Sequence, residues 1–284
     1  GYYGGMPKLN LKNPEVEKYI TDVACYWIKE CDIDGWRLDV GDEISHFFWK
    51  NFRKAVKAVK KDMLIIGEIW HYAGDFLEGD EWDTVMNYPF YLNLIDLLAD
   101  EKITVSQFVQ NLGYLKGRLH KNCYPLMWNL IDSHDTARFL HLCNDNKKKQ
   151  HLAAAFQLLL PGMPMIYYGD EYAMPGANDP DCRRGMYWDE EYQDKEMYEW
   201  YKRLIQVRKS HACIVEGELA GSVTEDEEGT VVLIRKNGEE TIAMIFNCSS
   251  SAKKFNEYTQ KYNLLTENTF DGNVEGFDAA VIVL

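Results

Sequence analysis

Segments with helical periodicity alternate with short apolar runs along most of this chain. A helix is predicted over 14–30, where apolar residues recur at helical spacing and Asn13 followed by Pro14 suits a helix start. A strand is predicted at 33–40, and the run 63–69 is flat and apolar, which is typical of a parallel strand buried on both faces. This alternation predicts about five βαβ units and a parallel sheet. The other expected elements are helices at 45–59, 91–98, 105–119, 147–160 and 195–210, and strands at 84–87, 126–131 and 165–168.

Beyond the last of these helices the sequence changes to short runs rich in β-branched residues, separated by Gly, Asn, Asp and Ser. Runs 230–235, 240–246 and 279–284 predict antiparallel strands of a small all-β sandwich. We therefore expect two domains, an α/β domain over 1–211 and a β-sandwich domain over 212–284.

The net charge of −14 argues against a nucleic-acid partner, because a phosphate backbone would be repelled and no basic stripe reverses the charge locally. The acidic run 225–228 is interpreted as a solvated hairpin turn. No apolar run reaches the ~18 residues that would indicate a membrane span, so a membrane partner is not expected either.

The cysteines are odd in number, scattered and without a CxxC pair. This pattern fits reduced thiols in a cytoplasmic protein better than a disulfide framework or a zinc site, and no metal ligands are predicted. Residues 1–5 do not resemble a signal peptide and read as an internal loop, so we expect a fragment of a longer protein. The seven cysteines are Cys25, Cys31, Cys123, Cys143, Cys182, Cys213 and Cys248.

Three acidic residues, Asp39, Glu68 and Asp135, stand where predicted strands end. The carboxyl ends of the strands are where active sites collect in barrels of alternating strands and helices. Cleaving a glycosidic bond with retention needs a carboxylate nucleophile and a carboxylic acid ~5 to 5.5 Å apart. The three acids together therefore favour a glycoside-processing enzyme.

The neighbours of two acids suggest different roles for them. Arg37 projects to the same side of its strand as Asp39, and its charge should hold the pKa of Asp39 low, as a nucleophile requires. Glu68 is flanked by Ile66 and Ile69, and an apolar setting should raise its pKa, as a general acid requires. Each residue also has a purely structural interpretation, as a strand-end ion pair or a loop cap.

The third acid, Asp135, could add negative charge that clamps sugar hydroxyls as positive charge develops at the transition state. His134 beside it could donate a hydrogen bond to the same sugar. The structural alternative is that His134 and Asp135 form an Asx-type turn without a catalytic role. Trp70 offers a flat face to a sugar ring, with simple core packing equally compatible with the sequence.

Several of these segments resemble the α-amylase superfamily, glycoside hydrolase family 13. The segments Asp34–Asp39, Gly67–Trp70 and Ser133–Asp135 resemble its second, third and fourth signature regions, in chain order. Met6–Asn10 is similar to a further region that marks the neopullulanase, cyclomaltodextrinase and maltogenic amylase branch. Asp179–Arg184 is similar to the loop after the last barrel strand in that branch.

The resemblance implies Asp39 as nucleophile, Glu68 as general acid/base and Asp135 as transition-state stabiliser. It also implies no cofactor, leaves calcium open, and makes an α-glucan or maltooligosaccharide the partner. The substrate-binding residues it implies are Arg37, His134, Glu43, His46, Trp70, Asp181 and Arg184.

The first signature region of the family has no counterpart here. The resemblance therefore implies about the last five units of a (β/α)8 barrel, followed by the sandwich, with a homo-oligomer or a missing barrel portion closing the sheet. The leading hypothesis is an α-retaining hydrolase of α-1,4 bonds in maltooligosaccharides, cyclodextrins or pullulan. The alternatives are an inactive fragment that serves as a sugar-binding or assembly module, or a related glucan transglycosylase. A lyase or isomerase would predict a lysine or metal-ligand cluster at strand ends, which the sequence lacks.

Overall fold

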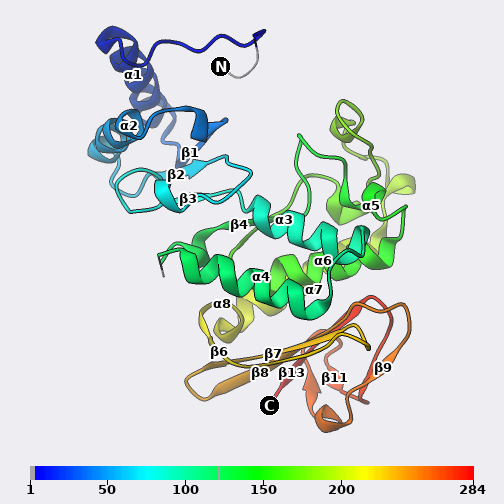
Figure 1. The fold of residues 1–284 in the computed structure, drawn as a ribbon. Helices are drawn as coiled ribbons and strands as arrows, with labels where there is room; N and C mark the ends of the chain where they lie inside the picture. The colour runs from blue at the N-terminus through cyan, green and yellow to red at the C-terminus, as the bar shows by residue number, and fades with distance from the viewer. Residues whose placement is uncertain (1–3, 121) are drawn as a thin grey trace. The chain divides into compact units, whose positions relative to one another are not determined.

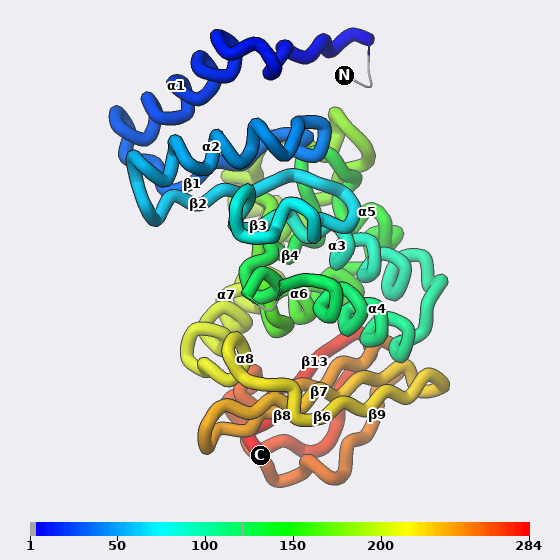
Figure 2. Tube along the Cα trace, turned by 60° about the vertical axis from the view of Figure 1, so that its left-hand side comes forward, coloured from blue at the N-terminus to red at the C-terminus, as the bar shows by residue number. Residues whose placement is uncertain are grey.

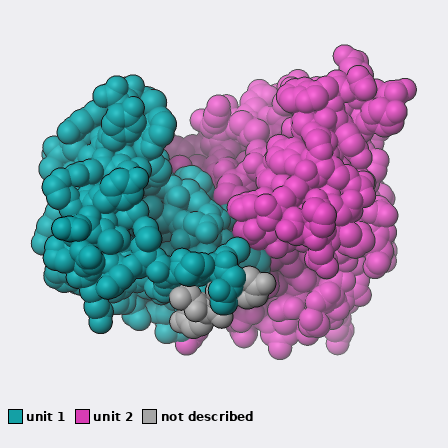
Figure 3. Space-filling view, turned by 90° about the horizontal axis from the view of Figure 1, so that it is seen from above, with its two compact units in different colours: residues 1–88, 115–128 teal, residues 89–114, 129–284 magenta. Residues whose placement is uncertain are grey.

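The computed structural model describes residues 4–120 and 122–284. These residues form two compact units, shown in different colours in Figure 3. The first unit reaches Tyr88 and also includes Leu115–Trp128, and the second comprises Pro89–Tyr114 and Asn129–Leu284. The predicted opening loop at 1–5 lies partly outside the described residues.

The first unit contains the first three parallel strands. Its elements are α1 (Pro14–Cys31), β1 (Gly35–Leu38), α2 (His46–Val59), β2 (Leu64–Gly67) and β3 (Thr84–Val85). The strands pair in the order β1–β2–β3, both pairs parallel, as the alternating pattern predicted.

Capping at both ends of α1 explains why it begins and ends where it does. At its start the Asn13 side chain accepts a hydrogen bond from the backbone N–H of Glu15, and Pro14 occupies the first turn. At its end Asp32 adopts a left-handed conformation, with φ of 48°, that turns the chain into β1. The short connection fixes where β1 starts.

The second unit contains the remaining helices. They are most of α3 (Tyr88–Leu94), a π-helical turn (Ile95–Ala99), the first part of α4 (Val105–Arg118), α5 (Phe139–Leu142), α6 (Lys147–Leu159), α7 (Lys195–Ser210) and α8 (Ala212–Glu216). The strand β4 (Trp128–Leu130) pairs with β5 (Met163–Met165). The predicted strand at 165–168 was misplaced, because the paired residues end at Met165 and the chain then turns through Gly169, whose φ is +88°.

An antiparallel sheet of six strands follows in the same unit, in the order β11–β10–β13–β8–β7–β6. Strands β6, β7, β8 and β13 lie side by side in Figures 1 and 2. The predicted acidic turn lies at the β6–β7 hairpin, although Glu225 itself is the last residue of β6. The strand bounds are β6 (Glu218–Glu225), β7 (Thr230–Asn237), β8 (Glu240–Asn247), β10 (Tyr262–Asn263), β11 (Asn268–Thr269) and β13 (Asp278–Val283), with a second sheet of β9 (Lys253–Lys254) and β12 (Asn273–Val274).

The two faces of this antiparallel sheet belong to different apolar cores. Val231 and Leu233 join the core that contains α6 and α7, whereas Val232 between them joins a smaller core on the other face. This alternation follows from the two-residue period of a strand. Phe156 of α6 stacks on Phe246 of β8, with ring centroids 4.2 Å apart, so the helix layer and the sheet pack directly against each other.

Candidate active site

Asp39 and Glu68 immediately follow the paired ends of two neighbouring parallel strands. Leu38 of β1 is in register with Gly67 of β2, and the backbone N–H of Glu68 donates to the carbonyl of Leu38 at 2.9 Å. The N–H of Gly41 in turn donates to the carbonyl of Glu68 at 3.1 Å. The first unit therefore brings these two predicted acids together at one edge of its sheet.

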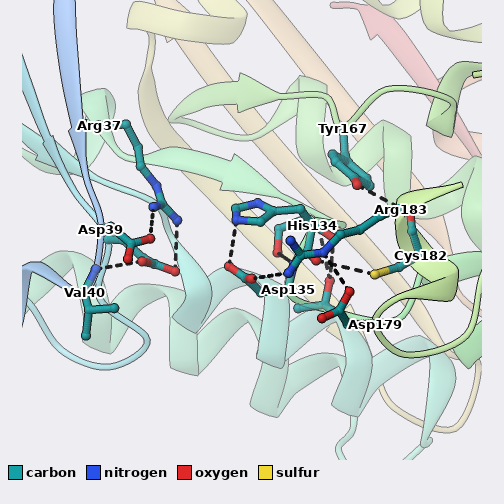
Figure 4. Close-up of polar contacts among 12 residues, drawn as sticks. Arg37, Asp39, Val40, His134, Asp135, Tyr167, Asp179, Cys182 and Arg183 are labelled. Atoms are coloured by element: carbon teal, nitrogen blue, oxygen red, sulfur yellow. Dashed lines mark hydrogen bonds and ion pairs between the residues drawn. The ribbon is translucent and has the colours of Figure 1, made fainter. Parts of the chain in front are cut away.

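One guanidinium group bridges the two carboxylates. Arg37 Nη1 lies 2.5 Å from Asp39 Oδ1, and Arg37 Nη2 lies 3.0 Å from Glu68 Oε1 (Figure 4). The Asp39 side chain is 77% exposed, whereas that of Glu68 is only 5% exposed. The predicted pairing of Arg37 with Asp39 is present, and it extends to Glu68, which the sequence did not indicate.

The surroundings of Glu68 differ from the apolar setting expected from its neighbours in sequence. Besides Arg37, the carboxylate accepts a hydrogen bond from the backbone N–H of Val40 at 2.8 Å and from the indole N–H of Trp70 at 3.4 Å. Val40 has a φ of 44°, a conformation that is rare for a β-branched residue. The loop after β1 folds back through this residue and supplies a donor that neighbouring residue types could not reveal.

Three further predicted substrate residues, Trp70, Glu43 and His46, lie in the first unit. Trp70 is 41% exposed and stacks on Tyr88, with ring centroids 4.1 Å apart, so one of its faces is covered. Glu43 pairs with Lys8, whose Nζ lies 3.4 Å from a carboxylate oxygen. Trp70 also contacts a predicted catalytic acid, through its indole N–H and Glu68.

His46 has a partner that the sequence did not indicate. It begins α2, and its Nδ1 lies 2.9 Å from the carboxylate of Glu81, whose pKa is raised chiefly by burial. The same imidazole stacks on Phe76, with ring centroids 4.4 Å apart. The side chain is nonetheless half exposed, which leaves one side of the ring open to solvent.

The second unit holds Asp135 in a tight loop that follows β4. The backbone N–H of Asp135 donates to Ser133 Oγ at 3.1 Å, and His134 Nε2 lies 3.2 Å from Asp135 Oδ2. Arg183 Nη2 lies 3.2 Å from the other carboxylate oxygen, and Arg183 Nε lies 2.8 Å from Asp179 Oδ1 (Figure 4). Asp135 is therefore paired with the predicted His134 and with an arginine that sequence reasoning passed over.

Two further predicted substrate residues, Asp181 and Arg184, pair with each other. Arg184 donates two parallel hydrogen bonds to Asp181, at 2.7 and 2.8 Å, which hold the pKa of that carboxyl below its usual range. Asp181 also accepts from the backbone N–H of Ala177 at 2.7 Å. The neighbouring Arg183 instead contacts Asp135. In the sequence, this contact was indicated only by the presence of two adjacent arginines.

Possible ligands for a metal are not gathered in the part of the chain that the structure describes. Within 4–120 and 122–284, no group of three or more His, Cys, Asp or Glu side chains could hold a metal ion. All seven cysteines are free thiols. None of the helices in these ranges is long and apolar enough to cross a membrane.

Parallel strands connected by helices, acids directly after two strand ends and an accompanying antiparallel sheet fit a TIM-barrel-type fold of the α/β class, which the solved structures that this chain resembles support. Residues 2–193 match the family model for the alpha amylase catalytic domain, and the chain belongs to this family.

Curated relatives and a solved structure carry names of the same branch. The chain is 47% identical to the cyclomaltodextrinase of Geobacillus thermopakistaniensis (strain MAS1) over 247 residues, 87% of this chain and 42% of that protein. It is 44% identical to the intracellular maltogenic amylase of Bacillus subtilis, over 85% of this chain and 41% of that protein. A solved cyclomaltodextrinase superimposes with a TM-score of 0.92 at 35% identity, over 98% of this chain and 50% of that one. The chain spans less than half the length of these curated relatives.

Proposed function

We propose that this chain contributes the catalytic acids of an α-retaining glycoside hydrolase that cleaves α-1,4-glucosidic bonds in maltooligosaccharides, cyclodextrins or pullulan. The observation that carries the proposal is the bridging of Asp39 and Glu68 by Arg37 at the ends of two adjacent parallel strands. The names of the relatives support the substrate class. The domain organisation that we propose with this function places the later part of a (β/α)8 barrel over 1–211 and a sandwich domain over 212–284.

The proposed reaction has two steps. Asp39 attacks the anomeric carbon, the bond from that carbon to the glycosidic oxygen breaks, and the oxygen takes a proton from Glu68. Glu68 then removes a proton from water, the water oxygen bonds to the anomeric carbon, and the ester to Asp39 breaks. Two displacements at one carbon give net retention. The high exposure of the Asp39 side chain supports its role as the group that substrate reaches.

Asp135 is proposed as the transition-state stabiliser, with His134 as a sugar-binding neighbour. Their mutual contact and the ion pair with Arg183 support this role, because they fix the direction of the carboxylate before substrate arrives. The other proposed substrate contacts are Arg37, Trp70, Glu43, His46, Asp181 and Arg184.

Hydrolysis of a cyclodextrin and of maltotriose by the purified chain tests the proposal. Asp39→Asn should lower kcat by about 10⁴-fold or more, because the nucleophile is lost. Asp22→Asn is the matched control, since Asp22 is an exposed acid on α1 that pairs only with Lys18 among the described contacts. Turnover of the Asp39 variant within a factor of ten of wild type would overturn the assignment.

The alternatives give different results in the same assay. A sugar-binding or assembly module would bind cyclodextrin equally well with and without Asp39 and would release no reducing sugar. A transglycosylase would convert maltotriose into longer glucans with a matching release of glucose or maltose, and the total number of reducing ends would not rise as it does in hydrolysis.

A further inference from the structure

A cluster of three charged residues is completely buried behind the Asp135 loop. Asp132 follows β4, Arg138 precedes α5, and Asp170 lies in the turn after β5. Each is at most 1% exposed. The cluster lies wholly within the second unit and takes no part in the proposed reaction.

The hydrogen bonds of this cluster close the loop that carries Asp135 and join it to the turn after β5. Asp132 Oδ1 accepts from the backbone N–H of Phe139 at 2.5 Å, which closes the loop containing Asp135. Arg138 Nη1 lies 3.1 Å from Asp170 Oδ1 and donates to the carbonyl of Tyr168 at 2.8 Å.

A second set of contacts ties the two segments directly to each other. The backbone N–H of Arg138 donates to the carbonyl of Gly176, at 2.9 Å. The Cys182 thiol donates to the carbonyl of His134, at 3.4 Å. Gly176 permits this approach, because a Cβ there would lie 3.0 Å from the backbone of Cys182.

The charges and hydrogen bonds of the cluster do not balance if both carboxyl groups are ionised. Two carboxylates would face one guanidinium, and a buried unpaired charge is strongly destabilising. The two carboxyl groups lie within hydrogen-bonding reach of each other, yet the Oδ2 atom of each has no donor among the described residues. A single proton between them would supply the donor and make the cluster of three residues neutral.

The surrounding groups favour that proton on Asp132. Burial raises the pKa of both carboxyl groups, and the neighbouring Asp170 raises that of Asp132 further. The ion pair with Arg138 favours the charged form of Asp170.

Among the described residues, the other polar and titratable groups packed on the cluster supply no second positive charge. They are Tyr201 of α7, whose pKa is raised by burial, Glu171 and Tyr167 beside Asp170, Cys143 after α5, and Gln150 of α6, whose amide donates to the carbonyl of Asp170 at 3.0 Å.

We propose that Asp132 and Asp170 share one proton at neutral pH and, with Arg138, act as positioning residues that hold the Asp135 loop and the Arg183 loop in place. The positioning of Asp135 matters for catalysis only if the proposed function holds, whereas the shared proton does not depend on it. Loss of the proton would leave two negative charges against one positive charge and would loosen both loops.

The sign of the pH dependence follows from the raised pKa values. The folded state keeps a proton that the unfolded chain releases near pH ~4. The stabilisation is therefore fully present below that pH and is lost progressively as pH rises toward the folded-state pKa. The thermal midpoint of the wild-type protein should fall between pH 5 and pH 8.

The test compares Asp132→Asn with the wild type by infrared spectroscopy and by thermal unfolding. The amide keeps a hydrogen-bond donor toward Asp170 but cannot titrate. The wild type should show the C=O band of a protonated carboxyl at pH 7, the variant should lack it, and the fall in thermal midpoint between pH 5 and pH 8 should be smaller in the variant. Asp22→Asn, the exposed control, should match the wild type in both measurements.

Activity gives a second, separable readout. If the chain hydrolyses maltotriose, Asp132→Asn should retain activity within a factor of about ten and should move the alkaline loss of kcat to higher pH. Asp170→Asn removes the carboxylate partner of Arg138 and should lower the thermal midpoint at every pH.

Absence of the protonated C=O band in the wild type, or an unchanged midpoint profile in Asp132→Asn, would overturn the shared proton even if hydrolysis is confirmed. The protonated C=O band and the changed midpoint profile of the variant would support the shared proton even if the chain showed no activity.

Discussion

Replacing Gly67 with alanine should destabilise the unit that holds Asp39 and Glu68. A Cβ at Gly67 would lie 2.3 Å from Cε3 of Trp82 and 2.5 Å from Cζ3. Non-bonded carbon atoms favour a separation of about 3.5 to 4.0 Å, so either the strand or the indole must move by about 1 Å or more.

The Trp82 indole has little freedom to move away. It is 1% exposed, and it stacks on Phe76 with ring centroids 4.1 Å apart. Overpacking of this kind costs about 1 to 3 kcal/mol, and we expect the upper end of that range. Because Gly67 immediately precedes Glu68, the strand displacement would also move the acid, and a misplacement of about 1 Å costs roughly 10²-fold in rate.

Urea unfolding followed by tryptophan fluorescence measures the loss. With a denaturant dependence of about 1 to 3 kcal/mol per molar urea, the midpoint should fall by about 1 to 3 M. Gly117→Ala is the control in the same unit, because Gly117 is an exposed helical residue with open space around its Cβ position. Alanine there should leave the midpoint unchanged or raise it, since alanine favours a helix over glycine by about 1 kcal/mol. Equal midpoints for Gly67→Ala and wild type would refute the reasoning.

Two further substitutions test the packing and the charges. Phe156→Ala should cost about 3 to 5 kcal/mol in unfolding free energy, because the ring is fully buried and stacked on Phe246; a loss below about 1 kcal/mol would show that the helix layer and the sheet do not share a core. Arg37→Met leaves the buried Glu68 carboxylate without its cation and should cost about 3 kcal/mol in a urea titration, with a large loss of activity. Arg37→Lys should recover only part of both, since a lysine cannot bridge two carboxylates as a guanidinium does, and full recovery would argue against the bridge.

The sequence predicted best those helices and strands whose apolar pattern is clear. The helix α7 was predicted with its observed bounds, and the structure shows Asp194 capping its start and a buried face that runs from Met197 to Val207. Strand β6 was missed because most of its residues are exposed and no alternation of apolar residues marks it. The apolar run at 165–168 was assigned as a strand, but Tyr167 and Tyr168 instead pack their rings against the buried Arg138 guanidinium.

The candidate site was predictable only where its contacts are local in sequence. The pairing of Arg37 with Asp39 follows from the two-residue period of β1. The contact of Arg183 with Asp135 joins residues 48 positions apart and depends on how a short turn aims one of two adjacent arginines. Asp132 and Asp170 are also far apart in sequence, so no local pattern could indicate their cluster.

The central claim is that Asp39 forms a covalent bond to the sugar. Incubating Glu68→Gln with an α-glucosyl fluoride, whose leaving group needs no protonation, should allow the first displacement and slow the second. Mass spectrometry of the digested protein should then find one glucosyl unit on the peptide that contains Asp39, and no label when Asp39→Asn is added. A label on another residue, or free sugar released at the same rate without any protein-bound sugar, would contradict the account.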